Sequence, residues 1–543
     1  MFSGIHKNIG SFLRFLSLRN PHAFTTTAVV CGILFLKAGI VIKNGFINGR
    51  LSMPLAYDDV SYFSEALILN AVFAEKGFVN GLMWIAQHLP HSPFSTFGAS
   101  ISLFVSNNAI WAPYFFTAVA IACALSVFVA ALRLSIAETV FFSVYFVSLP
   151  WYDAAVALYQ PDLLSGLFCA VNVYILLLVG LRGHCRVKVL FWGVFAGASL
   201  LIKPTAIPMF VVLLVPAFCV SVYGVKVADH LRGDGQGPAH VFMYIAGVVL
   251  ASCWYYIPRL QAVLDYITAA LGVQSYLWTV KMSFLESTAY YISFLYAYSG
   301  PSLIVLLVAV GLSWWGLFRS GIRGYSRIVL LTVVALILVA YIIPTATAVK
   351  APIYGSFFYS LIFLLPYTIP LFLRDTGSYQ EYPRLVAATY ILMCGLVVIG
   401  IKDNQARVHE TVAQAYGNFF NELKLFVMDR CGGLPCVVYF PVQAPIAPHS
   451  LDVFGMMSGN QIRTISTPLV ESFEEVLNYA SKSDVIVISD REMAVTRTKF
   501  PVATCLDSTI DYLLHDDRFK LIKKYKSHEF GNGSFYVFVN LDK

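Results

Sequence analysis

The stretch FTTTAVVCGILFLKAGIVI, residues 24–42, decides the class of this protein. A helix needs roughly 20 apolar residues to cross the hydrocarbon core of a bilayer, which is about 30 Å thick. This run is long enough, and no small-residue cleavage site follows it, so it predicts a first membrane span that is retained rather than a signal peptide.

The composition extends this interpretation to most of the chain. Hydrophobic residues make up 58% and charged residues 12%, with a mean hydropathy of +0.71, whereas soluble domains carry about 25% charged residues. The apolar runs predict an α-helical polytopic membrane protein with about 11 transmembrane helices. The predicted spans are 24–42, 110–131, 136–150, 163–181, 189–202, 205–223, 241–257, 300–318, 328–343, 354–373 and 385–401.

The distribution of Lys and Arg predicts the orientation. These residues gather in alternate gaps between the runs, and the basic side of a membrane protein faces the cytoplasm. The N-terminus is therefore expected inside the cell, and the long loops 43–109 and 258–299 outside. The net charge of +7 is spread over short gaps rather than along a stripe, so nucleic acid is not expected as a partner.

After the predicted transmembrane domain, residues 1–401, the composition becomes that of a soluble domain, residues 402–543, which is expected on the outer face. Five short β-rich runs alternate with two helix-like segments, 469–481 and 509–519, a pattern typical of an α/β fold. No Gly-rich phosphate loop follows a strand, so no nucleotide is predicted. Cys431 and Cys436 would close a small disulfide loop if this region is exported.

Acidic residues at the expected outer face are the first candidates for chemistry. Asp58 and Asp59 begin the amphipathic stretch DDVSYFSEAL; one Asp is a good helix cap, but two exceed what a cap needs. Asp162 follows Gln160 and Pro161 where a span begins, and Asp153 is its rival in the same gap. An acidic residue at the edge of the bilayer is costly to place there and is therefore a functional candidate.

Cations on the same face are the second group. Lys203, Arg259 and Lys350 lie on the side that should be poor in positive charge, and although a lone Lys is most simply an interface anchor, three predict a bound anion such as a phosphate. His88 and His91 share the first outer loop, but two His without a third ligand make a poor metal site. His91 is expected to contact the acceptor or to support the loop.

The chain resembles the polytopic glycosyltransferases of the GT-C superfamily, which use polyprenyl-phosphate sugars. This superfamily includes the bacterial aminoarabinose transferase of lipid A and the protein O-mannosyltransferases. The similar motifs are YDDVSYFSEA, HSPFSTFGASISLF, QPDLLSGLF, LIKPTAIPM and KAPIY, in order over roughly residues 20–400. Two departures are the Asp-Asp pair, where Asp-Glu is commoner, and KAPIY, which lacks the usual Arg before Tyr354.

This resemblance implies transfer of a sugar from a polyprenyl phosphate to an acceptor hydroxyl on the outer face, with inversion. The Asp-Asp pair leaves open which of its two carboxylates is the base; Asp58 is the first choice, with Asp59 and Asp162 positioning the sugar or acceptor. Phosphate contacts would come from the cations and Tyr354. The acceptor could be a lipid, a glycan or a protein, membrane lipids are partners, and a divalent metal stays open.

The expected location is the inner membrane of a bacterium, although the sequence also allows a eukaryotic membrane. The alternative function is a transporter or flippase of a lipid-linked or anionic substrate. That class calls for charged residues at the middle of spans and paired broken helices. The predicted spans are nearly free of interior charge, which favours the enzyme.

Overall fold

The structure is a computed structural model, and it describes sixteen parts of the chain: residues 21–48, 51, 58–88, 92–181, 186–232, 237–271, 280, 282–304, 306–308, 311, 325–347, 350–368, 410–441, 447–491, 500–526 and 533–543. They form two compact units. One contains residues 1–41, 82–95 and 114–405, and the other contains residues 42–81, 96–113 and 406–543. The predicted domain boundary after residue 401 lies outside the described residues.

Helices α2 to α15 carry the membrane region. Their bounds are α2 Pro21–Asn48, α3 Asp58–His88, α4 Pro93–Val105, α5 Trp111–Leu132, α6 Ile136–Ser148, α7 Pro150–Leu158, α8 Pro161–Tyr174, α9 Arg186–Leu200, α10 Ile207–Arg232, α11 Gly237–Leu271, α12 Phe284–Ser299, α14 Tyr325–Ala346 and α15 Ser356–Leu364. A short η2 turn, Ile175–Val179, extends α8.

Among the described residues, seven helices are long and apolar enough to cross a membrane, and the α6–α7 pair, bent by 66°, would make eight. These helices and the mostly helical architecture confirm an integral membrane protein of the predicted class. The number of about eleven spans stays a prediction, because the spans 300–318 and 385–401 fall wholly or largely outside the described residues. Helix α3 is one of these seven helices, but it is kinked at Gly77, where φ is +79°.

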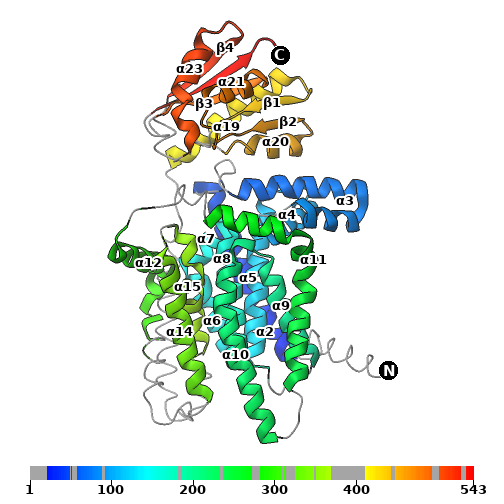
Figure 1. The fold of residues 1–543 in the computed structure, drawn as a ribbon, viewed down its shortest axis with the longest axis vertical. Helices are drawn as coiled ribbons and strands as arrows, with labels where there is room; N and C mark the ends of the chain where they lie inside the picture. The colour runs from blue at the N-terminus through cyan, green and yellow to red at the C-terminus, as the bar shows by residue number, and fades with distance from the viewer. Residues whose placement is uncertain are drawn as a thin grey trace. The chain divides into compact units, whose positions relative to one another are not determined.

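Helix α8 is the centre of the bundle, and its whole length is buried. It contacts α9, α10 and α15, and it runs roughly alongside α5, α9, α10 and α14 (Figure 1). Large aromatic side chains fill the neighbouring core: Tyr367 donates to the carbonyl oxygen of Phe142 at 2.7 Å, and Tyr174 donates to that of Leu361 at 2.7 Å. Phenol groups buried in hydrocarbon need such internal acceptors.

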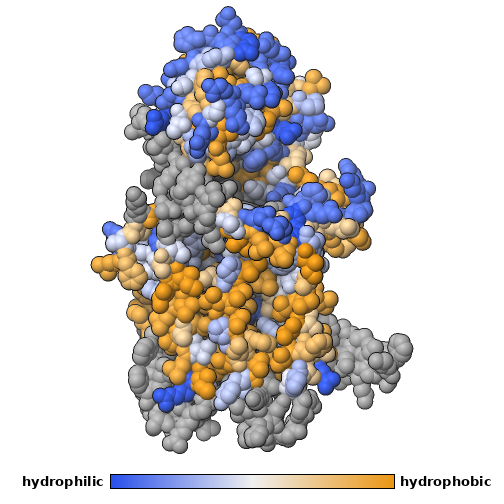
Figure 2. Space-filling view, viewed as in Figure 1, coloured by the Kyte–Doolittle hydropathy of each residue, from blue (hydrophilic) through white to orange (hydrophobic). Residues whose placement is uncertain are grey.

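The outer surface of the bundle is apolar. Helices α10 and α14 expose side chains such as Val211, Val215, Leu331 and Leu338, and Figure 2 shows a largely hydrophobic surface over these helices. The C-terminal part of the chain is coloured mainly hydrophilic in the same view. This contrast is that of a lipid-facing bundle and a water-facing domain.

Small residues let α9 and α11 approach each other closely. A Cβ atom on Gly193 would lie 2.1 Å from the carbonyl oxygen of Tyr244, and one on Gly197 would lie 2.5 Å from that of Val248. Gly247 of α11 is equally confined against the carbonyl oxygen of Leu190, at 2.3 Å. Glycines four residues apart, such as Gly193 and Gly197, allow this close helix packing in membranes. The packing holds α11 against α9 and so helps to position the part of α11 that follows Val248.

The C-terminal region forms a five-stranded sheet in the order β2-β1-β3-β5-β4. Strands β1 (Cys436–Tyr439), β2 (Ile462–Ile465) and β3 (Val485–Ser489) are parallel, and β5 (Ser534–Asn540) and β4 (Phe519–Lys526) are antiparallel to their neighbours. All five correspond to the predicted β-rich runs, so the α/β fold is confirmed.

Four helices cover the two faces of this sheet. Helix α19 (Glu410–Cys431) and α20 (Ser450–Ser458) pack on one face, and α21 (Phe473–Ser481) and α23 (Leu506–His515) on the other. The predicted helix 509–519 was too long at its end, because α23 stops at His515 and Phe519 already pairs with β5. Helix α19 is joined to β1 by the disulfide of Cys431 and Cys436.

Candidate functional site

The structure brings two of the predicted site residues into direct contact. Lys203 Nζ lies 2.5 Å from Asp162 Oδ2, and about a tenth of each side chain is exposed. Pro161 begins α8 with its fixed φ, and Asp162 follows in the first turn, where a carboxylate favours the helix dipole. Lys203 has extended backbone angles in the turn that separates α9 from α10. The two charges therefore meet where one helix begins and two others join.

Residues 92–94, called the Pro-rich stretch below, lie where α4 begins and pack on the same turn. Ser92 Oγ donates to the carbonyl oxygen of Ile202 at 2.5 Å, and the Phe94 amide donates to that of Leu201 at 3.2 Å. Tyr159, three residues before Asp162, donates its hydroxyl to the carbonyl oxygen of Ser95 at 2.5 Å. Three stretches far apart in the sequence, each part of a motif that the resemblance singled out, thus share one location.

Helix α11 supplies two further side chains to this location. The Tyr256 hydroxyl donates to the carbonyl oxygen of Leu200 at 2.5 Å, and Arg259 Nε donates to that of Ala86 at 2.5 Å. Tyr256 and Arg259 are three residues apart and so lie on the same helix face. Arg259 thus lies against the residues that lead into the Pro-rich stretch, and it brings a positive charge to that segment.

Lys350 has a different environment. Its ammonium donates to the carbonyl oxygens of Pro344 at 2.9 Å, Thr345 at 2.8 Å and Thr347. These carbonyls end α14, so Lys350 satisfies acceptors that the helix leaves unpaired. Burial lowers the pKa of Lys350 below its usual value. The contacts observed for Lys350 are therefore those of a helix cap.

Tyr354 follows in a short 3-10 turn, Pro352–Gly355, and 37% of its surface is exposed. This turn leads to Ser356, whose carbonyl oxygen would lie 2.4 Å from a Cβ atom on Gly166. Gly166 is one helical turn beyond Asp162 on α8. The segment that carries Tyr354 is thus packed against the same helix as the buried ion pair.

The acidic pair lies in the other compact unit, at the start of α3. Asp59 is 3% exposed, and its Oδ1 accepts the amide of Val60 at 3.0 Å. Asp58 occupies the first helical position, but its side chain and His91 lie outside the described residues. The prediction that the acidic pair acts together with Asp162 and Lys203 therefore stays a prediction.

Helix α3 carries a carboxylate, Glu65, that was not predicted as a site residue. Glu65 Oε2 accepts the hydroxyl of Thr96 at 2.7 Å, and five residues along the helix Asn70 Oδ1 accepts that of Ser100 at 2.5 Å. These bonds fasten α3 to α4. The run from Asp58 to Glu65 in the sequence was the available signal for this position.

A second buried ion pair was missed by the sequence analysis. Lys37 Nζ of α2 lies 3.0 and 3.1 Å from the two carboxylate oxygens of Asp153 on α7. Lys37 belongs to the first predicted span, and it is an exception among spans that are otherwise nearly free of interior charge. The signal was the single Lys in the opening run, and its partner was Asp153, considered only as a rival of Asp162.

A metal site needs several ligands that converge. Among the residues that the structure describes, no group of three or more His, Cys, Asp or Glu side chains is placed to hold a metal ion. Asp162, the best placed carboxylate, already has an ammonium partner. Asp162 and Lys203 form a buried charge pair, and Arg259 adds a further cation on α11.

Comparison with known proteins identifies the fold. Neither a family model nor a curated protein sequence matches the chain. The crystal structure of ArnT from Cupriavidus metallidurans in the apo state is similar over 94% of this chain and 97% of that chain, with 10% identity and a TM-score of 0.52.

A second crystal structure of ArnT from the same organism is bound to undecaprenyl phosphate. It covers 95% of this chain and 97% of that chain, with 11% identity and a TM-score of 0.52. The arabinofuranosyltransferase AftD from Mycobacteria has a lower TM-score of 0.41, with 12% identity over 90% of this chain and 42% of that chain. The chain has the GT-C fold of the ArnT structures, as its sequence motifs predicted.

Proposed function

We propose that this protein is an integral membrane glycosyltransferase that transfers a sugar from a polyprenyl phosphate to an acceptor hydroxyl on the outer face. The observation that carries the proposal is the buried contact between Asp162 and Lys203. It lies where the Pro-rich stretch packs on the turn that contains Lys203 and Pro204. The fold shared with ArnT, of which one structure is bound to undecaprenyl phosphate, supports the class of donor.

The phosphate is the leaving group in this reaction. Its negative charge grows as the bond from the sugar C1 to the phosphate oxygen breaks, and fixed cations stabilise such a charge in a site with little water. Lys203 and Arg259 suit this role because both are held by hydrogen bonds to neighbouring segments. Lys350 is proposed in a lesser role, since its observed partners are carbonyl oxygens, and Tyr354 is proposed as a phosphate or sugar contact.

The acceptor hydroxyl attacks C1 from the face opposite to the phosphate, which inverts the configuration. As the new bond forms, the hydroxyl proton passes to a carboxylate, and the polyprenyl phosphate leaves with the electron pair of the broken bond. Asp58 is the proposed base. Asp59 and Asp162 are proposed to position the acceptor and the sugar, and His91 to contact the acceptor. A lipid, a glycan and a protein are all open as acceptors.

The disulfide between Cys431 and Cys436 supports an outer location for the C-terminal domain, because disulfides persist in oxidising compartments. Together with the Lys and Arg distribution it favours a cytoplasmic N-terminus. We place the protein in the inner membrane of a bacterium, with residues 402–543 in the periplasm. The oxidised state can be checked by labelling thiols before and after reduction in intact cells.

The direct test is transfer of label. The purified protein is incubated with a panel of radiolabelled polyprenyl-phosphate sugars and membrane lipids, and labelled product is sought. Asp58→Asn should abolish transfer while the protein stays folded and inserted in the membrane. Asp265→Asn is the matched control, because Asp265 is an exposed carboxylate of α11 that accepts a hydrogen bond from the side chain of Gln261. Full activity in Asp58→Asn would refute the assignment of the base.

The alternative, a transporter or flippase, is favoured by one observation. Lys37 of the first predicted span forms a charge pair with Asp153, and ionisable groups within spans often mark a substrate or ion pathway. The alternative predicts movement of lipid or ions in vesicles with no labelled product from any donor. Transfer that proceeds without such movement excludes it.

A further inference from the structure

The edge strand β4 of the C-terminal sheet contains a β-bulge. Its register with β5 shifts between Leu521 and Lys523, so Ile522 has no partner of its own. A bulge places consecutive side chains on the same face of a sheet, and bulges often re-aim a side chain next to a functional site. Ile522 and Lys523 both turn toward α19 as a result.

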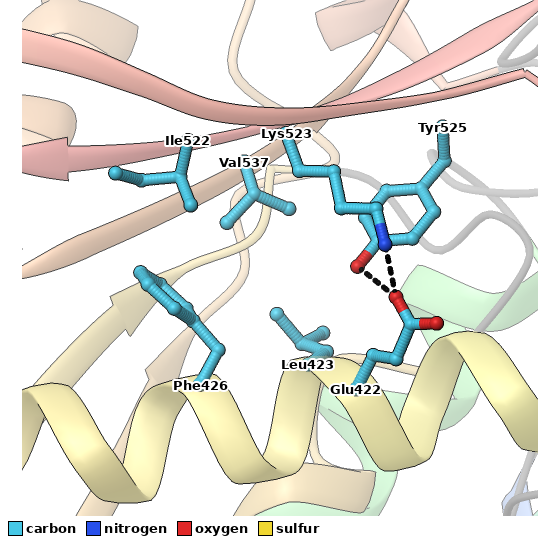
Figure 3. A pocket seen from close by; sticks show the side chains of 7 residues that line it. All are labelled: Glu422, Leu423, Phe426, Ile522, Lys523, Tyr525 and Val537. Atoms are coloured by element: carbon cyan, nitrogen blue, oxygen red, sulfur yellow. Dashed lines mark hydrogen bonds and ion pairs between the residues drawn. The ribbon is translucent and has the colours of Figure 1, made fainter.

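These side chains and α19 enclose a pocket (Figure 3). Its volume is about 180 Å³. An engineered cavity of about 150 Å³ holds a benzene molecule, so this pocket has room for one six-membered ring with small substituents. Its lining is Glu422, Leu423, Phe426, Ile522, Lys523, Tyr525 and Val537.

The polar wall of the pocket pairs opposite charges. Lys523 and Tyr525 both donate to Oε2 of Glu422, the phenol at 2.9 Å, and the Lys523 ammonium lies 4.6 Å from the centre of the Tyr525 ring. Among the described residues no hydrogen bond reaches the other carboxylate oxygen, Oε1. The wall therefore offers acceptors and N–H donors side by side, which is what a hydroxyl group requires.

The opposite wall is apolar. Leu423 and Phe426 project from α19, and Ile522 and Val537 from the sheet (Figure 3). The charges of Lys523 and Glu422 balance each other, so the polar wall favours neither an anion nor a cation, and a pure hydrocarbon would use neither the second carboxylate oxygen of Glu422 nor the other N–H donors of Lys523. A ring with hydroxyl groups on one side and C–H groups on the other satisfies both walls.

We propose that this pocket binds one neutral sugar unit of a glycan. Glu422 and Lys523 are half exposed, at 51% each, so the sugar can enter while further units extend into solvent. Lys on an edge strand also protects a sheet against aggregation, but that role needs no pocket with an apolar floor. The site does not depend on the proposed transfer reaction, and its binding is measured without turnover.

The probe is a panel of methyl glycosides of glucose, galactose, mannose and N-acetylglucosamine. Saturation-transfer NMR is recorded on the full-length protein in a detergent without a sugar headgroup, because a maltoside would compete. Glycoside concentrations reach about 20 mM, since a single small ligand is expected to bind with a dissociation constant in the millimolar range. At least one glycoside should show saturation transfer, and silence of the whole panel would overturn the proposal.

The test variants are Lys523→Ala and Ile522→Trp, which remove a donor and fill the pocket. Each should weaken binding at least tenfold. The matched control is Lys524→Ala: this neighbour lies on the other face of the strand, with its ammonium 4.7 Å from the ring centre of Tyr536. Equal binding in Lys523→Ala and wild type, or equal loss in Lys524→Ala, would overturn the proposal.

A last variant separates this site from the membrane site. The double variant Lys203→Met/Asp162→Leu, which removes both charges of the buried pair, should lose transfer yet keep glycoside binding. Loss of binding in this double variant, with binding intact in Lys523→Ala, would place the sugar in the membrane unit and refute the pocket. Failure of the transfer assay alone leaves the pocket proposal standing, because the two readouts are independent.

Discussion

Lys203→Met is the sharpest test of the buried ion pair. The change leaves the carboxylate of Asp162 in a site where the residue is only 8% exposed. At the observed 2.5 Å, two unit charges attract by roughly 7 kcal/mol at an effective dielectric constant of about 20. Desolvation offsets part of this attraction, so removing one partner should lower the free energy of unfolding by about 3–5 kcal/mol.

The double variant Lys203→Met/Asp162→Leu removes both charges and keeps the volume. Its stability should return to within about 1 kcal/mol of wild type, since apolar replacement of a buried pair is often neutral. Transfer should stay absent, because the phosphate has lost its cation. This combination of recovered stability and lost activity separates a functional pair from one that only supports the fold.

The assay is reversible unfolding in mixed detergent micelles, followed for the two single variants and the double variant. The surface pair of Asp516 and Arg518 supplies the control: Arg518→Met should cost far less stability than either single variant of the buried pair, because ion pairs in contact with water contribute little. Single variants at Lys203 or Asp162 that cost no more than this control would refute the reasoning. So would a double variant whose loss equals the sum of the two.

Three further predictions concern packing, the disulfide and pH. Gly193→Leu should separate α9 from α11 and lower both thermal stability and transfer, measured on the purified protein, because its Cβ position lies 2.1 Å from a carbonyl oxygen; unchanged melting would contradict this packing. Cys431→Ser/Cys436→Ser should lower the stability of the C-terminal region by about 2 kcal/mol, from the closure entropy of a loop of about five residues, and wild type under reductant should match it in denaturant unfolding. Hydrogen bonds from Lys523 and a tyrosine hold the pKa of Glu422 below its usual value, so their contribution is present above about pH 4 and is lost as pH falls through the folded pKa. The stability difference between wild type and Glu422→Gln should vanish in acid, and a difference that grows there would contradict the shift.

Much of the fold could be predicted from the sequence, because its determinants are local. The apolar run 24–42 is long enough to span a membrane whatever surrounds it. The strand β3 is a short β-branched run, buried on both faces, and such runs are typical of central strands. The end of α23 was misplaced because Asp516 and Asp517 continue a helical pattern, whereas the structure uses the next residues to start a strand.

The site was only partly predictable. Asp162 and Lys203 were each named, but as a positioning carboxylate and a phosphate contact, since nothing in a single sequence shows that residues 41 apart form a pair. Lys350 was predicted to bind an anion because it lies on the expected outer side of the membrane. Its observed carbonyl partners could not be predicted, because they depend on where α14 ends. The pocket at β4 had no sequence signal, because one inserted residue in a strand becomes a bulge only when the neighbouring strand defines the register.

The pair of Lys37 and Asp153 has a consequence for biogenesis. The partners are 116 residues apart, so α2 leaves the ribosome and meets the translocon long before its counter-charge is synthesised. A charge near the centre of a lone helix costs about 2.5–3.5 kcal/mol on insertion, which the rest of this apolar segment must outweigh. Until α7 is made, Lys37 has no Asp153 to pair with, so the order of synthesis requires α2 to enter the membrane before this contact can stabilise it.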